Sequence, residues 1–182
     1  MRLHLLLVAI FGILIPYWKG LDFFDPVITA AYACMGPLFS APASAQSFGA
    51  SRPQSMREAC ARAAKTVLYG EALVMIFLLT GTVTVGLSHG ARLLLPDLDV
   101  IAEASLLGLA ATVAAAGLSA WATLHFSPAA ARLAMRVIFL VLLIVFLYNS
   151  RRLTNVTWIG TALCAAAAGV SVLLLRKEVS PR

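Results

Sequence analysis

The stretch VIFLVLLIVFLY, at positions 137–148, contains no charged side chain and is the most apolar run in the chain. Hydrophobic residues make up 61% of the 182 positions, charged residues make up 12%, and the mean hydropathy is +0.91. A typical soluble domain is about 45–50% apolar and about 25% charged. This composition excludes a disordered chain, which requires low hydrophobicity, and argues strongly against a soluble globule. We therefore expect a polytopic membrane protein.

Six segments are apolar enough to be considered as membrane-crossing helices, which need about 20 residues each. They are residues 3–18, 26–47, 66–88, 100–126, 128–149 and 154–175. The first is short, and the second is rich in small residues and contains two prolines. The segments between them are too short to hold a soluble domain. The sequence therefore predicts an all-α bundle of about six transmembrane helices, in a single domain covering residues 1–182.

Two of the expected helices have clear start signals. Asp25 precedes Pro26, and Ser127 precedes Pro128, so each pair places a capping side chain before a proline at the first helical position. Because Ser127 and Pro128 lie between two long apolar segments, we expect those two helices to form a tight hairpin.

The basic residues fall mainly on one side of this arrangement. If the N-terminus is cytoplasmic, ten basic residues lie inside and four lie outside, as the positive-inside rule requires. The inner set is Arg2, Arg52, Arg57, Arg62, Lys65, Arg132, Arg136, Arg176, Lys177 and Arg182, and the outer set is Lys19, Arg92, Arg151 and Arg152. We expect a multi-pass protein of the cell membrane (inner or plasma membrane) with both termini in the cytoplasm.

Residues 55–65 form the best organised segment outside the expected spans. Ser55 and Glu58 fit a capping box, and the following residues are amphipathic with a basic face that includes Arg57, Arg62 and Lys65. The sequence predicts a short cytoplasmic interfacial helix, serving either as a lipid anchor or as a docking face for a cytosolic partner. The formal net charge of +6 is interpreted as attraction to anionic membrane lipid, and we expect no nucleic-acid partner.

The order of these elements resembles that of ABC-exporter-type permease subunits. The resemblance rests on six spans, two cytoplasmic termini and a short inner helix after the second span, and not on a specific motif. It implies that residues 55–65 act as a coupling helix that receives motion from a separate cytosolic ATPase subunit. The chain is short for that family, its outer loops are small, and it contains no GxxxxGK[ST] motif for binding ATP itself.

Glu71 and Arg136 are the main ionisable residues that a bilayer disfavours. Charged side chains within a span usually face the bundle interior or a cavity. Glu71 lies near the start of the third expected span, and Arg136 lies eight residues into the fifth, from the same side. We consider a structural role, as an ion pair or with Glu71 snorkelling to the interface, and a functional role as a substrate or proton site at the inner mouth of the bundle.

The second expected span has an interrupted backbone. Gly36 and Pro37, followed by Pro42, remove helical hydrogen bonds at two positions. The carbonyl groups so released need partners within the protein or in a wet cavity. The pattern predicts a broken helix, which is either a simple kink or part of a transport pathway.

The sequence contains no set of convergent catalytic groups. Cys34, Cys60 and Cys164 are far apart without a CxxC motif, and no HExxH motif is present. We expect no enzymatic activity, no metal and no cofactor. The leading functional hypothesis is a permease-like transporter subunit lacking its own ATPase; the alternative is a non-catalytic scaffold or assembly subunit of a larger membrane complex. The first requires a polar, water-accessible cavity, and the second a dry interior with a large apolar flank.

Overall fold

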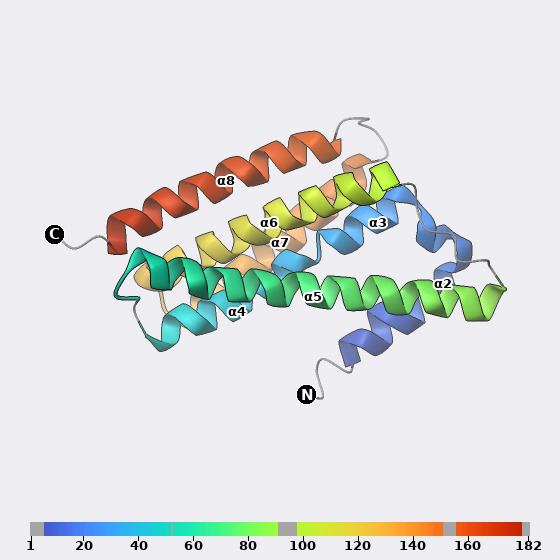
Figure 1. Ribbon diagram of the computed structural model, residues 1–182, viewed down its shortest axis with the longest axis horizontal. Coiled ribbons are helices and arrows are strands. Elements are labelled where there is room, and N and C mark those ends of the chain that lie inside the picture. Colours follow the sequence, from blue (N-terminus) through green and yellow to red (C-terminus); the bar gives the residue numbers. More distant parts are fainter. Residues whose placement is uncertain (1–5, 52, 91–97, 151–155, 180–182) are drawn as a thin grey trace.

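The computed structural model describes residues 6–51, 53–90, 98–150 and 156–179, and every regular element among them is a helix. The long helices lie side by side in an elongated bundle (Figure 1). Four of them are long and apolar enough to cross a membrane: Met56–His89, Ile101–His125, Pro128–Val145 and Thr157–Val179. The structure therefore confirms the prediction of an all-helical fold, with several helices of the length and apolar composition that a membrane span needs.

The N-terminal third is built from shorter elements than predicted. These are the π-helix η1 (Val8–Leu14), α2 (Ile15–Lys19), the 3-10 helix η2 (Gly20–Phe24), α3 (Pro26–Ala33) and α4 (Gly36–Ala50). Asp25 caps α3 by accepting a hydrogen bond of 2.8 Å from the Val27 N–H, which confirms that start signal. None of these helices has the length of a membrane span by itself. Residues 26–47 are divided between α3 and α4, and the described part of residues 3–18 contains η1 and most of α2.

The helix α5 (Met56–His89) contains 34 residues and begins where the capping box predicts. The Glu58 N–H donates to the Ser55 hydroxyl over 3.2 Å. The prediction of a separate helix over residues 55–65 is wrong, because α5 continues through Lys65 and Thr66 without interruption. No proline or capping residue separates the basic segment from the apolar one. At its other end α5 is terminated by Gly90, whose φ of 60° is left-handed.

The remaining helices are α6 (Leu98–His125), α7 (Pro128–Ser150) and α8 (Val156–Val179). The Ser127 hydroxyl accepts from the Ala130 N–H over 3.3 Å at the start of α7, which confirms that start signal, and only Phe126 and Ser127 lie between α6 and α7. α8 extends four residues beyond the predicted end at residue 175, and Arg176 and Lys177 occupy its last turn. The expected starts at residues 3 and 154 lie outside the described residues.

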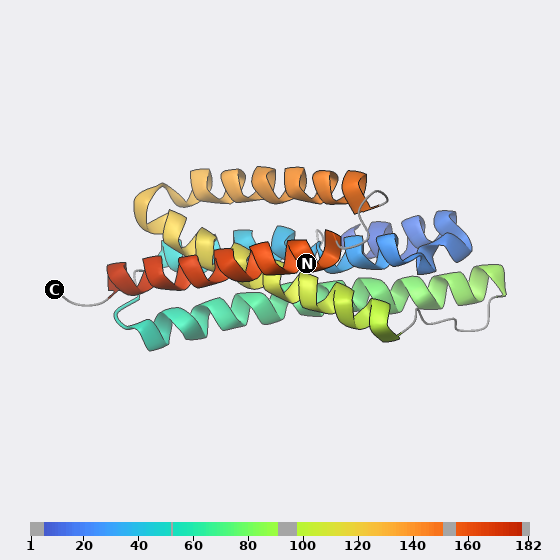
Figure 2. The same cartoon turned by 90° about the horizontal axis from the view of Figure 1, so that it is seen from above.

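α6 is the central helix, packed mainly against α4 and α8. Its small residues permit this close packing, since Ala111, Ala114 and Ala115 are all buried. A side chain at Gly117 would collide with the Ser171 hydroxyl of α8. Figure 2 shows α5 and α7 on opposite sides of the bundle, with α6 and α8 between them.

One end of the bundle gathers three chain segments that the sequence predicts on the same side of the membrane. The α4–α5 connection, the α6–α7 turn and the C-terminal end of α8 lie together there (Figure 1). The inner basic residues that the structure describes belong to these segments: Arg57, Arg62, Lys65, Arg132, Arg136, Arg176 and Lys177. Arg2, Arg52, Arg92, Arg151, Arg152 and Arg182 lie outside the described residues.

Candidate functional site

The helix break is present at the predicted position. Cys34 and Met35 separate α3 from α4, and Pro37 occupies the first turn of α4, where its missing N–H is tolerated. The Met35 N–H turns back to the Tyr32 carbonyl over 3.0 Å, and the Met35 carbonyl accepts from the Leu38 N–H over 3.0 Å. Pro42, in contrast, lies inside α4 without ending it.

Glycines bring two neighbouring helices close to this break. A Cβ on Gly70 of α5 would lie 3.0 Å from the Gly36 carbonyl oxygen. A Cβ on Gly108 of α6 would lie 2.7 Å from the Ala33 carbonyl oxygen. Both distances are too short for a side chain, so α5 and α6 pack directly on the backbone of the break.

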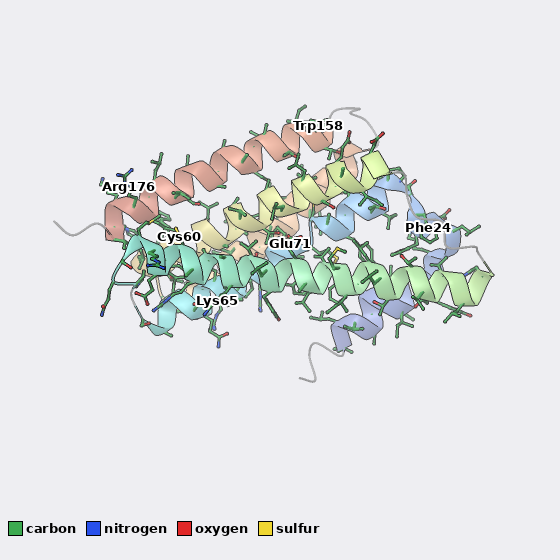
Figure 3. The ribbon with its side chains drawn as sticks, viewed as in Figure 1. Phe24, Cys60, Lys65, Glu71, Trp158 and Arg176 are labelled. Atoms are coloured by element: carbon green, nitrogen blue, oxygen red, sulfur yellow. The ribbon has the colours of Figure 1, made fainter. Side chains whose placement is uncertain are left out.

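Glu71 lies beside the break and is bonded to α6. It is half-buried, and its Oε1 accepts a hydrogen bond of 2.7 Å from the Thr112 hydroxyl, which belongs to a fully buried residue. A Cβ on Gly36 would lie 3.0 Å from the same Oε1 and would collide with the Thr112 hydroxyl. Glu71 is 15 residues past Met56, about 22 Å along α5 at 1.5 Å per residue. Figure 3 shows it midway along the bundle.

The Thr112 hydroxyl lies within hydrogen-bond distance of two acceptors. The hydroxyl has one hydrogen, but its oxygen lies 2.7 Å from both Glu71 Oε1 and the Gly108 carbonyl oxygen. When Glu71 is ionised, Thr112 can donate to one of these acceptors at a time. The Thr112 hydroxyl is therefore shared between a link to α5 and a bond within α6.

Arg136 lies in a different environment from Glu71. The ion pairs found among the described side chains join Arg62 to Glu58 and His125 to Glu178, and Glu71 and Arg136 do not form one. Arg136 is exposed and lines an open cavity of about 610 Å³ between α4, α5 and α7. The structure thus separates the two residues that the sequence places together.

Arg62 has a structural role at the end of the bundle. Its guanidinium donates to the Ser51 carbonyl over 2.7 Å, to the Ser47 carbonyl over 3.1 Å, and to the Glu58 carboxylate. These bonds tie the end of α4 to the start of α5. Arg57 and Lys65 remain exposed, so the predicted docking face is reduced from three residues to two.

The cysteines are free thiols in the structure. Cys34 and Cys164 both line an apolar cavity of about 260 Å³ between the α3–α4 break and the helices α6, α7 and α8. Among the described residues, no group of three or more His, Cys, Asp or Glu side chains is placed to hold a metal ion.

Several residues of the site were missed by the sequence analysis. Thr112 and Gly108 lie in an Ala-rich helix, where neither has a distinctive pattern, and Gly70 has no signal beyond its place next to Glu71. Arg132 carries a usable signal, because it precedes Arg136 by four residues and so shares a helix face with it.

No protein-family model, curated protein or solved structure matches this chain.

Proposed function

We propose that this chain is a membrane-embedded, permease-like subunit of a transporter whose energy is supplied by a separate chain. The observation that carries the proposal is the contact of Glu71 with Thr112 at the α3–α4 break. Ionisable residues within membrane helices are costly, and broken helices commonly form transport sites. A half-buried carboxyl group beside a broken helix suits a proton or cation step at this position.

In this proposal the chain crosses the membrane six times, with both ends in the cytoplasm. Residues 26–47 form one crossing that is broken into α3 and α4, and the N-terminal helices form another. α5 is about 51 Å long at 1.5 Å per residue, compared with about 30 Å for the hydrocarbon core. Its first turns, with Arg57 and Lys65, therefore extend beyond the hydrocarbon on the cytoplasmic side.

The proposed partner is a cytosolic ATPase that docks on the end formed by the α4–α5 connection. Arg57 and Lys65 are exposed there, and Arg62 holds the connection in place. The rigid link from this end to Glu71 is α5 itself. Motion of the docked subunit would thus be transmitted along one helix to the break.

Purification from native membranes in a mild detergent tests this assignment. We expect an ATPase to copurify with the chain and to be lost from an Arg57→Glu/Lys65→Glu variant. A Lys19→Glu variant, changed at the other end of the bundle, is the matched control and should retain it. Isolation with a redox or photosynthetic complex in place of an ATPase would contradict the proposal.

A scaffold or assembly subunit is the second candidate, favoured by the exposed flank of α7 and α8. Only 11% of the apolar stretch of each of these two helices is buried, whereas half of that of α6 is buried. Leu133 on α7 and Leu163 and Leu173 on α8 are each about two-thirds exposed. Such a flank fits lipid or another membrane subunit, and a stable stoichiometric complex through it without an ATPase would favour this candidate.

A further inference from the structure

The cavity between α4, α5 and α7 has a basic rim at one end. Arg132 and Arg136 are one helical turn apart on α7, so both side chains lie on the face that lines the cavity. Gln46 of α4 and Tyr69 of α5 line it as well. None of the described residues that line it is acidic. The cavity therefore presents two positive charges without a carboxylate beside them.

The other part of the cavity is apolar. Leu38 and Phe39 of α4 and Leu7 near the N-terminus line it, while Leu133 of α7 lies between the two arginines. Phe39 precedes Gln46 by seven residues, which corresponds to about 10 Å along α4. The polarity of the cavity thus changes along its length, from basic near the end of the bundle to apolar toward its middle.

In the six-span arrangement proposed above, the start of α7 lies at the membrane surface, which places the two arginines near the boundary between lipid headgroups and acyl chains. Arg132 and Arg136 lie four and eight residues past Pro128, about 6 and 12 Å from the start of α7. Basic pockets between membrane helices at this depth bind phosphate headgroups, and Arg binds phosphate through paired hydrogen bonds. With about 610 Å³ of space, the cavity is large enough for a headgroup and the first part of a chain.

We propose that this cavity binds an anionic phospholipid, with its phosphate at Arg132 and Arg136 and its acyl chain directed past Leu38 and Phe39. The site lies apart from Glu71, which is not among the residues that line it. The proposal concerns binding alone, so it holds whether or not the chain transports anything.

The test measures lipid binding to the full-length protein, purified in a zwitterionic detergent and stripped of native lipid. The probe is short-chain phosphatidylglycerol, with short-chain phosphatidylcholine and inorganic phosphate as comparison ligands, and native mass spectrometry as the readout. We expect phosphatidylglycerol to bind more tightly than either comparison ligand. Replacing both arginines, in Arg132→Gln/Arg136→Gln, should weaken its binding about 30-fold.

An Arg176→Gln/Lys177→Gln variant is the matched control. It also loses two positive charges near the same end of the bundle, but from the exposed last turn of α8 outside the cavity. It should bind phosphatidylglycerol within about twofold of the parent protein. An Arg132→Lys/Arg136→Lys variant keeps both charges and should keep most of the binding, and it serves if the Gln variant does not fold.

Three results would overturn the proposal. The first is an equal loss of binding in the cavity variant and in the α8 control, because the effect would then be general electrostatics. The second is equal affinity for phosphatidylcholine, which would remove the role of net charge. The third is equal affinity for inorganic phosphate, which would make the site one for a free anion and not for a lipid.

Discussion

The Thr112 hydroxyl is fully buried and links α5 to α6 through Glu71. A buried or half-buried carboxyl group that loses its hydrogen-bond donor costs about 1–3 kcal/mol. The Glu71–Thr112 contact therefore contributes to stability as well as defining the candidate site. The contributions of Glu71 and Thr112 to stability can be measured separately with conservative substitutions that keep the volume of each side chain.

The Thr112→Val variant should be destabilised by about 1–3 kcal/mol, since it removes the donor and leaves the shape nearly unchanged. Glu71→Gln should cost less than about 1 kcal/mol, because its amide oxygen can still accept from Thr112. Unfolding in detergent, followed by circular dichroism, measures both.

Thr123→Val is the matched control for Thr112→Val. Its hydroxyl donates to the Ala120 carbonyl over 2.7 Å, within the same helix, and makes no link to Glu71. It should change the free energy of unfolding by about 0.5 kcal/mol or less. Equal destabilisation of the Thr112→Val and Thr123→Val variants would show that the Glu71 contact contributes nothing.

Gly36 has no room for a side chain, whereas a methyl group on Gly169 in α8 would meet no atom within 4 Å. Gly36→Ala should therefore push α4 away from Thr112 and cost about 1–3 kcal/mol. Gly169→Ala should be neutral or stabilising by up to about 1 kcal/mol, through helix propensity alone. Thermal unfolding of the two variants in parallel measures the difference, and a stabilised Gly36→Ala variant would be inconsistent with the close packing at the break.

Sequence alone identified the residues that act locally. Asp25, Ser55 and Ser127 cap helices as predicted, because a cap bonds to N–H groups two or three residues away. The partner of Glu71 could not be found in this way. Thr112 is 41 residues distant, and its position depends on how α5 and α6 pack against each other.

At the scale of elements, the α4–α5 connection is held by one side chain. Arg62 donates to carbonyl groups of Ser47 and Ser51 and to the Glu58 carboxylate, so it joins the end of one helix to the start of the next. Glu58 in turn accepts from the Gln54 N–H over 2.9 Å. These bonds explain how a short connection can turn the chain back without a further helix.

An Arg62→Met variant should lose about 1–2 kcal/mol of stability and open the connection to proteases, because several hydrogen bonds are removed together. Arg57→Met, on the exposed side of the same helix, is the control and should stay within about 0.5 kcal/mol of the parent. Limited proteolysis and thermal unfolding give the two readouts. Identical cleavage of the two variants at residues 51–55 would show that the Arg62 hydrogen bonds do not hold the connection in place.

The sequence predicted most helix boundaries correctly, but it did not predict which neighbouring segments join into one continuous helix. The break at Gly36 and Pro37 was predictable, because proline lacks the donor that would continue the helix. The fusion of residues 55–65 with 66–88 into α5 was not. An amphipathic segment and an apolar segment can form one continuous helix when neither a proline nor a capping residue separates them. A change in hydropathy indicates a change in the surroundings of a helix and does not mark where the helix ends.

At the scale of the whole molecule, the structure has features expected of both candidate functions. The half-buried Glu71 lies beside the broken helix, which agrees with a permease. The apolar flank of α7 and α8 agrees with contact to lipid or to other membrane subunits. The two candidate functions differ in whether water reaches the interior of the bundle from the end that carries Arg57 and Lys65.

Cysteine accessibility in membrane vesicles measures this directly. In a background with Cys34, Cys60 and Cys164 replaced by Ala, single Gln46→Cys, Glu71→Cys and Val141→Cys variants are treated with a small, membrane-impermeant methanethiosulfonate reagent from either side. Gln46 lines the cavity, Glu71 is half-buried at the break, and Val141 is exposed on the apolar flank of α7. We predict labelling of the Gln46→Cys and Glu71→Cys variants from the cytoplasmic side, and none of the lipid-facing Val141→Cys variant. Protection of both Gln46→Cys and Glu71→Cys from both sides would mean a dry interior and would contradict the proposed permease.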